Sequence, residues 1–227
     1  MYDSPAVADS FYPEATVDRL TTLLCDVRQA TDRLAQRTTR QRSHALKTMG
    51  DAILSEHDRI LEANTLDLEI SREMAVPEQV TDWLKLTPER IHRAARILHR
   101  LGDLGNPFDL WAERRRPVGV VALVYESFPE LGVLAAGLCL RTCNGLLLKG
   151  SNEASQTNQV LVDVLSAALA TTDLPTGMLQ LVPSTWSDVT RSILVRQPEL
   201  DLVIPHGRPK LIGQVVSQAE APVVPTY

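Results

Sequence analysis

Hydrophobic positions follow two different spacings along this chain of 227 residues. In the first hundred residues, apolar side chains recur at intervals of three and four, which is the spacing of one helix face. The predicted helices are Glu14–Arg37, Arg40–Glu56, a segment from Ser55 or His57 to Asn64, and a segment from Pro88 to Leu101 with Thr87 as its N-cap. Residues 1–13 lack this periodicity, and we expect an irregular arm there.

From Pro117 onwards, short apolar runs alternate with amphipathic segments. The runs predict strands at Val118–Tyr125, Gly145–Leu148, Leu179–Val182 and Leu200–Ile204, with one more strand beginning at Pro222. The segments between them predict helices after Pro129, over Glu153–Ala170, over Ser187–Val195 and over Leu211–Ala219. The first two strands are apolar on every side chain, so we expect helices on both faces of the sheet.

This alternation is typical of a doubly wound, Rossmann-like parallel α/β sheet with right-handed crossovers. We therefore expect a helical part over residues 14–105 and an α/β part over residues 117–227 of a single domain.

Composition indicates an ordinary globular protein and argues against a nucleic-acid-binding or membrane-spanning one. The chain is 44% hydrophobic and 22% charged, which is ordinary for a soluble globular protein, and its net charge of −5 gives no basic character for nucleic acid. No apolar run reaches the length of a membrane span. The three cysteines, Cys25, Cys139 and Cys143, are an odd and widely spaced set, which favours reduced thiols in the cytoplasm and no metal site.

Polar side chains gather where three of the predicted strands end. These corners are Glu126-Ser127, the segment Lys149–Glu153, and His206-Gly207-Arg208, and each precedes a helix whose N-terminus suits a phosphate. Lys149 can pair with a phosphate or a ribose hydroxyl, and Arg208 can bind a phosphate with its forked guanidinium. The bland alternatives stay open: a Lys149–Glu153 surface ion pair, helix capping by Ser151-Asn152, and ordinary solvated loops.

A set of motifs along nearly the whole chain resembles one family. The matching stretches are Pro117-Val118-Gly119, Tyr125-Glu126-Ser127-Phe128-Pro129, Leu138-Cys139-Leu140, Asn144-Gly145, Lys149-Gly150-Ser151, Glu153-Ala154 and Leu200–Arg208, with Asn64 and Leu86–Ile91 upstream. Together they resemble γ-glutamyl phosphate reductase, also called glutamate-5-semialdehyde dehydrogenase, of the aldehyde dehydrogenase superfamily. That family reduces γ-glutamyl phosphate with NADPH in proline biosynthesis, by way of a cysteine thioester.

The resemblance implies NADPH as cofactor and assigns its site. Lys149 and Glu153 would lie near the adenosine ribose and its 2′-phosphate, and the corner from His206 to Arg208 would face the pyrophosphate. The cofactor-binding residues implied are Tyr125, Ser127, Lys149, Ser151, Glu153, His206, Gly207 and Arg208. No catalytic residue is assigned within the chain, because the family's nucleophilic cysteine follows the strand that begins here at Pro222. We therefore expect the catalytic domain to be absent.

The sequence departs from the family pattern elsewhere too. Phe128-Pro129-Glu130 replaces an R-P-N corner whose amide corresponds to an oxyanion donor, and an ionised Glu130 cannot donate. The link from Asn106 to Arg116 is too short for the family's oligomer-building hairpin, Cys143 replaces a glycine, and His206 and Arg208 replace Arg and Gly.

Two hypotheses follow. In the first, the chain is the cofactor-binding half of such a reductase, and it meets γ-glutamyl phosphate only if a catalytic domain is supplied. In the second, it is a non-catalytic nucleotide-binding or scaffold protein, with an exposed apolar face for a partner or for self-association.

Overall fold

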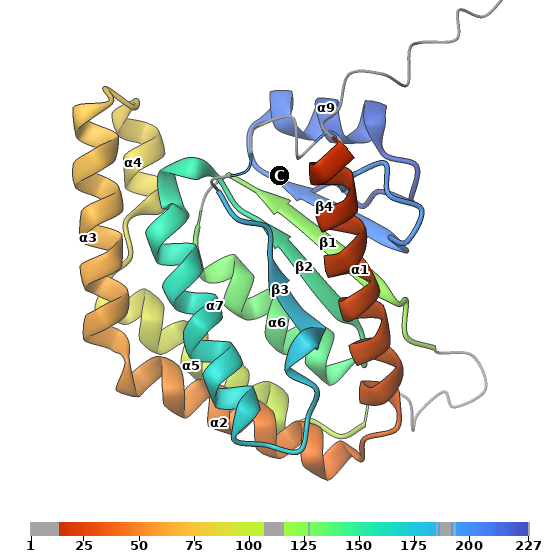
Figure 1. The fold of residues 1–227 in the computed structure, drawn as a ribbon. Helices are drawn as coiled ribbons and strands as arrows, with labels where there is room; N and C mark the ends of the chain where they lie inside the picture. Colours follow the sequence, from red (N-terminus) through yellow and green to blue (C-terminus); the bar gives the residue numbers. More distant parts are fainter. Residues whose placement is uncertain are drawn as a thin grey trace, which may run out of the picture.

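The structure is a computed structural model that describes residues 14–106, 116–126, 128–184, 186, 192 and 194–226, and only the backbone of residues 14–16. Figure 1 shows a parallel sheet enclosed by helices. The arm expected at residues 1–13, most of the link after Asn106 and most of the helix expected over Ser187–Val195 lie outside the described residues.

The helical part contains five helices within the described residues. They are α1 (Glu14–Ala35), α2 (Thr39–Ser55), α3 (His57–Glu73), α4 (Glu78–Leu84) and α5 (Pro88–Asp103). The predicted N-cap of α5 is confirmed, because the Thr87 hydroxyl accepts a hydrogen bond from the backbone N–H of Arg90 at 3.3 Å.

The predicted end of the third helix was wrong, and α4 was not predicted. Asn64 does not end α3, which continues to Glu73. The Asn64 side chain is buried, and its amide pairs with the backbone of the segment after α4, at Leu84 and Leu86. An asparagine that usually marks a helix end here satisfies backbone groups of another segment from inside a helix.

The four strands are all parallel and lie in the order β3-β2-β1-β4. Their bounds are β1 (Val120–Tyr125), β2 (Gly145–Lys149), β3 (Leu179–Leu181) and β4 (Leu202–His206), and the helices between and after them include α6 (Glu130–Arg141), α7 (Ser155–Ala170) and α9 (Pro209–Gln218). Single bridges from Val203 to Val223 and from His206 to Thr226 place the last residues beside β4, as the predicted fifth strand requires. The predicted class, a doubly wound parallel α/β sheet, is confirmed.

Helices cover both faces of the sheet. One apolar cluster joins alternate residues of β1, such as Val121 and Leu123, to α6 and α7, with α2 and α5 behind them. The other joins Val120, Ala122 and Val124 to α1 and α9. The period of two along a strand thus sends successive side chains into two cores, which explains the unbroken apolar run of β1.

Several strand boundaries differ from the prediction: β2 ends at Lys149 rather than Leu148, β3 ends at Leu181 rather than Val182, and β4 begins at Leu202 rather than Leu200. β1 begins at Val120 rather than Val118, because Gly119 has a φ of +123° and a Cβ there would lie 2.0 Å from the Asp201 carboxylate. β4 runs to His206 rather than Ile204, so His206 belongs to the strand and not to the corner.

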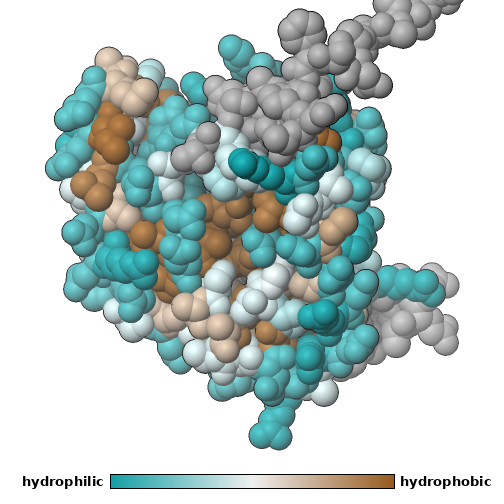
Figure 2. Space-filling model, viewed as in Figure 1, coloured by the Kyte–Doolittle hydropathy of each residue, from teal (hydrophilic) through white to brown (hydrophobic). Residues whose placement is uncertain are grey.

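Apolar side chains also remain on the surface. Leu66 and Ile70 of α3, and Met74 directly after its last residue, recur every four residues and are about half exposed or more. Figure 2 shows apolar surface on the α3 side of the molecule. Among the described residues, no helix combines the length and apolar character needed to cross a bilayer.

Candidate functional site

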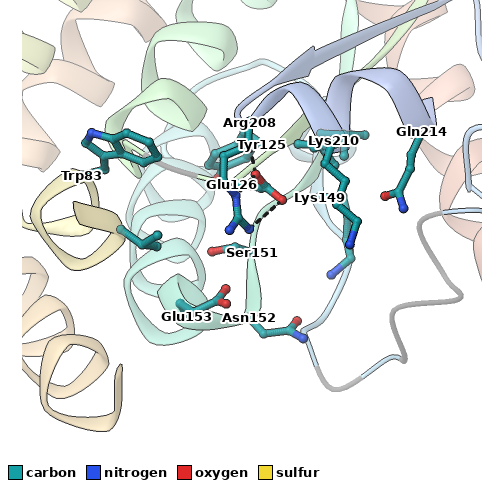
Figure 3. A pocket seen from close by; sticks show the side chains of 13 residues that line it. Trp83, Tyr125, Glu126, Lys149, Ser151, Asn152, Glu153, Arg208, Lys210 and Gln214 are labelled. Carbon is teal, nitrogen blue, oxygen red and sulfur yellow. Dashed lines mark hydrogen bonds and ion pairs between the residues drawn. The ribbon is translucent and has the colours of Figure 1, made fainter. Parts of the chain in front are cut away.

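The strand order creates a crevice at the carboxyl ends of β1 and its neighbours. The chain builds β1, β2 and β3 outward in one direction and then returns to place β4 on the other side of β1. Ligands of open parallel sheets bind where the strand order reverses in this way. A pocket of about 420 Å³ opens here between α4 and α9 (Figure 3). The described residues that line it are Val80, Trp83, Val124, Tyr125, Glu126, Lys149, Ser151, Asn152, Glu153, Arg208, Lys210, Leu211 and Gln214.

The end of β2 supplies one wall of the pocket. Val124 of β1 pairs with Lys149, which brings the two strand ends level. Lys149 is buried, with its ammonium 3.3 Å from the backbone oxygen of Gly150. Ser151 follows directly before a short 3-10 turn, Asn152–Ala154, which contains Glu153 and leads into α7. Three of the predicted residues, Lys149, Ser151 and Glu153, therefore lie together in the pocket.

The position of that turn depends on α3. The Asp67 carboxylate accepts hydrogen bonds from the backbone N–H of Gln156 at 3.1 Å and of Thr157 at 2.8 Å, and from the Thr157 hydroxyl at 2.6 Å. Burial raises the pKa of Asp67, partly offset by these hydrogen bonds. Sequence reasoning missed Asp67, although it lies one helical turn after Asn64, on the same face of α3.

The ends of β1 and β4 supply the opposite wall. Tyr125 pairs with His206 in register, and Glu126 and Arg208 follow the two strands. The Arg208 guanidinium grips the Glu126 carboxylate, with Nε–Oε2 at 2.9 Å and Nη2–Oε1 at 3.2 Å (Figure 3). The predicted phosphate-binding fork of Arg208 is thus engaged with Glu126 in this structure.

Gly207 has a backbone conformation that favours glycine. Its φ is +154°, and a Cβ there would lie 3.0 Å from Oε2 of Glu126. The backbone at the start of α9 therefore approaches the corner more closely than a larger residue would allow.

Of the other predicted residues, His206 lies at the edge of the site, Tyr125 belongs to the pocket lining, and Ser127 cannot be placed. The His206 ring is not part of the pocket lining; its Nδ1 lies 2.9 Å from the Thr226 hydroxyl, and burial lowers its pKa, which favours the neutral ring. Tyr125 is buried beneath the pocket, where its hydroxyl donates to Asn158 at 2.9 Å and burial raises its pKa. Ser127 lies outside the described residues.

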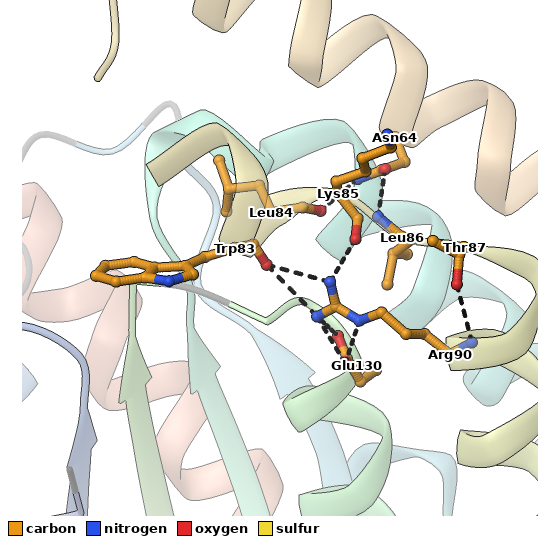
Figure 4. Close-up of polar contacts among 8 residues, drawn as sticks. All are labelled: Asn64, Trp83, Leu84, Lys85, Leu86, Thr87, Arg90 and Glu130. Carbon is orange, nitrogen blue, oxygen red and sulfur yellow. Dashed lines mark hydrogen bonds and ion pairs between the residues drawn. The ribbon is translucent and has the colours of Figure 1, made fainter. Parts of the chain in front are cut away.

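Glu130, which departs from the family pattern at Phe128-Pro129-Glu130, is paired with an arginine. Glu130 forms a bidentate ion pair with Arg90, whose Nε donates to Oε1 at 2.7 Å and whose Nη2 donates to Oε2 at 2.7 Å (Figure 4). Only 20% of the Arg90 side chain and 19% of the Glu130 side chain are exposed. Glu130 is not among the residues that line the pocket. Its carboxylate instead holds the Arg90 side chain in place.

The described cysteines do not offer a reactive thiolate at this site. Cys139 and Cys143 are buried, and burial raises the pKa of Cys139 to about 12 and also raises that of Cys143. Cys25 is exposed on α1, away from the pocket lining. Among the described residues, no group of three or more His, Cys, Asp or Glu side chains is arranged to hold a metal ion.

Comparison with known proteins identifies the family. Residues 10–226 match the family described as "Aldehyde dehydrogenase family". The chain belongs to the aldehyde dehydrogenase family. That membership implies a nicotinamide cofactor, and the pocket fits one: it combines Lys149, Ser151 and Glu153 at the end of β2 with the first turn of α9, which follows β4.

Individual relatives within this family point to one kind of enzyme. Gamma-glutamyl phosphate reductase 2 of Synechocystis is 40% identical over 195 residues, covering 81% of this chain and 46% of that protein. Gamma-glutamyl phosphate reductase of Anoxybacillus flavithermus is 33% identical, covering 88% of this chain and 51% of that protein. The resemblance seen in the sequence motifs is confirmed. The chain spans about half the length of the curated relatives it matches.

Solved structures agree. Gamma-glutamyl phosphate reductase from Thermotoga maritima superposes with a TM-score of 0.82 at 30% identity, covering 90% of this chain and 52% of that chain. A probable aldehyde dehydrogenase from Listeria monocytogenes, at 14% identity, shares the fold with a TM-score of 0.75.

Proposed function

We propose that this chain supplies the NADPH-binding part of a γ-glutamyl phosphate reductase that works in the cytoplasm. The observation that carries this proposal is the pocket itself. Lys149 at the end of β2, and Ser151 and Glu153 just after it, lie near the Gly207 corner that follows β4, at the reversal of strand order, in a chain whose relatives are reductases of this name.

Each residue has a proposed task. Lys149 holds an adenosine ribose hydroxyl or the 2′-phosphate, and Glu153 accepts from a ribose hydroxyl. The backbone at Gly207 and the first turn of α9 receive the pyrophosphate, since a helix N-terminus presents unpaired N–H groups and partial positive charge. Glu126 holds Arg208 at the rim of the pocket, where the two side chains form a neutral pair.

The chemistry that follows binding is hydride transfer, which the nicotinamide supplies. The described residues bind and orient; none of Cys25, Cys139 and Cys143 is placed to attack an acyl phosphate. In this proposal the nucleophile is a residue other than these three. The alternative of a non-catalytic scaffold is not favoured, because the curated relatives named above are reductases.

The proposal is tested by calorimetric titration of the purified chain with NADPH and with NADH. We expect saturable binding of NADPH and weaker binding of NADH. Lys149→Met should weaken NADPH by about tenfold or more, because one charge-assisted contact of about 1.5–3 kcal/mol is lost. Lys85→Met is the matched control, because the Lys85 side chain is exposed and outside the pocket lining.

Absence of NADPH binding at millimolar concentration would contradict the proposed function. Equal weakening by Lys149→Met and Lys85→Met would contradict the assigned role of Lys149. Thermal unfolding of both variants shows that each is folded when it is titrated.

A further inference from the structure

The helical part of the chain contributes an aromatic side chain to the pocket. Trp83, near the end of α4, lines the pocket together with Val80 (Figure 3). The Trp83 side chain is partly exposed rather than buried in a core. None of the sequence motifs pointed to Trp83, because α4 itself was not predicted.

Hydrogen bonds from two other segments hold the backbone at Trp83 in place. Its carbonyl oxygen accepts from the backbone N–H of Phe128 at 3.3 Å and from Arg90 Nη1 and Nη2 at 3.4 Å. Arg90 also donates to the carbonyl oxygen of Lys85 (Figure 4). One guanidinium therefore ties the end of α4 to the following loop.

Asn64 of α3 fixes the residues between these points. Its Nδ2 donates to the Leu84 carbonyl at 2.9 Å, and its Oδ1 accepts from the Leu86 N–H at 2.8 Å (Figure 4). Polar groups of Leu84, Lys85 and Leu86 are thus all engaged by side chains. These hydrogen bonds restrict the conformations of the segment that carries Trp83 before a ligand binds. Less conformational entropy is then lost on binding, which favours affinity.

The ion pair with Glu130 holds Arg90 in turn. Glu130 occupies the first turn of α6, directly after β1 and Phe128. Phe128 lies under the Arg90 cation at 5.3 Å and within 6.4 Å of the Trp83 ring. The rings of Phe128 and His206 are 6.0 Å apart, so an aromatic row runs from α4 to the end of β4.

We propose that Trp83 is a ligand-binding residue that contacts the nicotinamide half of the dinucleotide, with Arg90 and Glu130 as its positioning residues. This inference rests on the proposed function, which assigns the adenosine half to Lys149 and Glu153 at the end of β2. Trp83 and Phe128 stand instead at the end of β1, towards β4, where the other half would extend. A large flat side chain on a fixed backbone suits a planar heterocycle.

The test compares NADP⁺ with 2′,5′-ADP, which keeps the adenosine and its phosphates but lacks nicotinamide. Trp83→Leu should weaken NADP⁺ about threefold to tenfold, the range expected for one lost aromatic contact, and leave 2′,5′-ADP unchanged. Trp83→Phe should restore most of the affinity, because it keeps a ring. Trp186→Leu is the matched control, since Trp186 is not among the pocket-lining residues.

Glu130→Gln tests the positioning pair. It should weaken NADP⁺ in the same direction as Trp83→Leu, again without changing 2′,5′-ADP. A lowered melting temperature with unchanged NADP⁺ affinity would overturn the positioning role.

A second measurement needs no change at Trp83. With Trp111 and Trp186 replaced by Phe, Trp83 is the one tryptophan of the three in the chain that remains, and NADP⁺ should quench its emission more than 2′,5′-ADP does. Equal quenching by both ligands, or equal loss of both affinities in Trp83→Leu, would overturn the inference and leave the proposed function standing. Failure of the unchanged chain to bind either ligand would contradict both.

Discussion

At the residue scale, side chains of similar appearance in the sequence have different partners. Lys149 and Arg208 were both read as phosphate-binding cations, yet Arg208 grips Glu126 while Lys149 lies buried in the pocket wall. Glu126 and Glu130, four residues apart, pair with arginines of different parts of the chain, Arg208 after β4 and Arg90 in α5. Residue type and spacing predict what a side chain can do, whereas its partner depends on which segments the fold brings together.

The arginines of the two glutamate–arginine pairs differ in exposure, and this difference predicts how much each pair contributes to the free energy of unfolding. Arg208 is 53% exposed, so Glu126→Gln should lower the free energy of unfolding by less than about 1 kcal/mol. Glu130→Gln should cost about 1–3 kcal/mol, because it leaves a largely buried guanidinium short of an acceptor. Urea unfolding of the two variants measures both values. Equal costs would contradict the roles described for the two pairs.

The cysteines should differ in reactivity. Burial raises the pKa of Cys139 to about 12, so its thiol stays protonated at neutral and mildly alkaline pH, and Cys143 is shifted in the same direction. We expect iodoacetamide to label Cys25 alone in the folded chain and all three cysteines in urea. Intact-mass spectrometry counts the adducts. Rapid labelling of Cys139 in the folded chain would show that its surroundings are not those described.

At the element scale, helix periodicity was informative and helix ends were less so. The three-four spacing predicted α1, α2 and α5, and the Thr87-Pro88 signal placed the start of α5 correctly. Asn64 misled because a polar residue at a plausible helix end was in fact a buried hydrogen-bonding group. Nothing local to α3 reveals that Asn64 and Asp67 satisfy backbone groups in distant segments.

Asp67 links α3 to the start of α7, which yields a prediction with a defined pH dependence. Asp67→Asn should cost about 1–3 kcal/mol, because an amide cannot accept all three hydrogen bonds. Since the folded pKa of Asp67 is raised above its unfolded value, its titration favours the folded state below the unfolded pKa. That contribution is lost as pH rises through the folded pKa.

The cost of Asp67→Asn should therefore be larger near pH 3.8, the ordinary pKa of this carboxyl, than at neutral pH. Urea unfolding at both pH values measures the difference. Asp163→Asn, on the exposed side of α7, is the control and should show no comparable change. A cost that grows towards neutral pH would contradict the direction given for the Asp67 pKa.

At the scale of the whole molecule, the sheet assembles the site from segments that lie far apart in the sequence. The alternation of apolar runs predicted the parallel sheet, and the strand-end rule predicted one crevice at the ends of several strands, where the pocket lined by Lys149 and Arg208 lies. The sequence could not show that Trp83 and Val80 close that crevice from the helical part, because their placement depends on how α3, α4 and α5 pack.

Hydrogen–deuterium exchange with and without saturating NADP⁺ tests the location of the site most directly. Slower exchange is predicted in two segments, residues 149–156 after β2 and residues 207–214 at the start of α9, because their backbones border the proposed ligand. Residues 39–55 of α2, which contribute nothing to the pocket lining, serve as the internal reference and should be unchanged. Protection confined to other parts of the chain, or none in these two segments at saturation, would contradict the account.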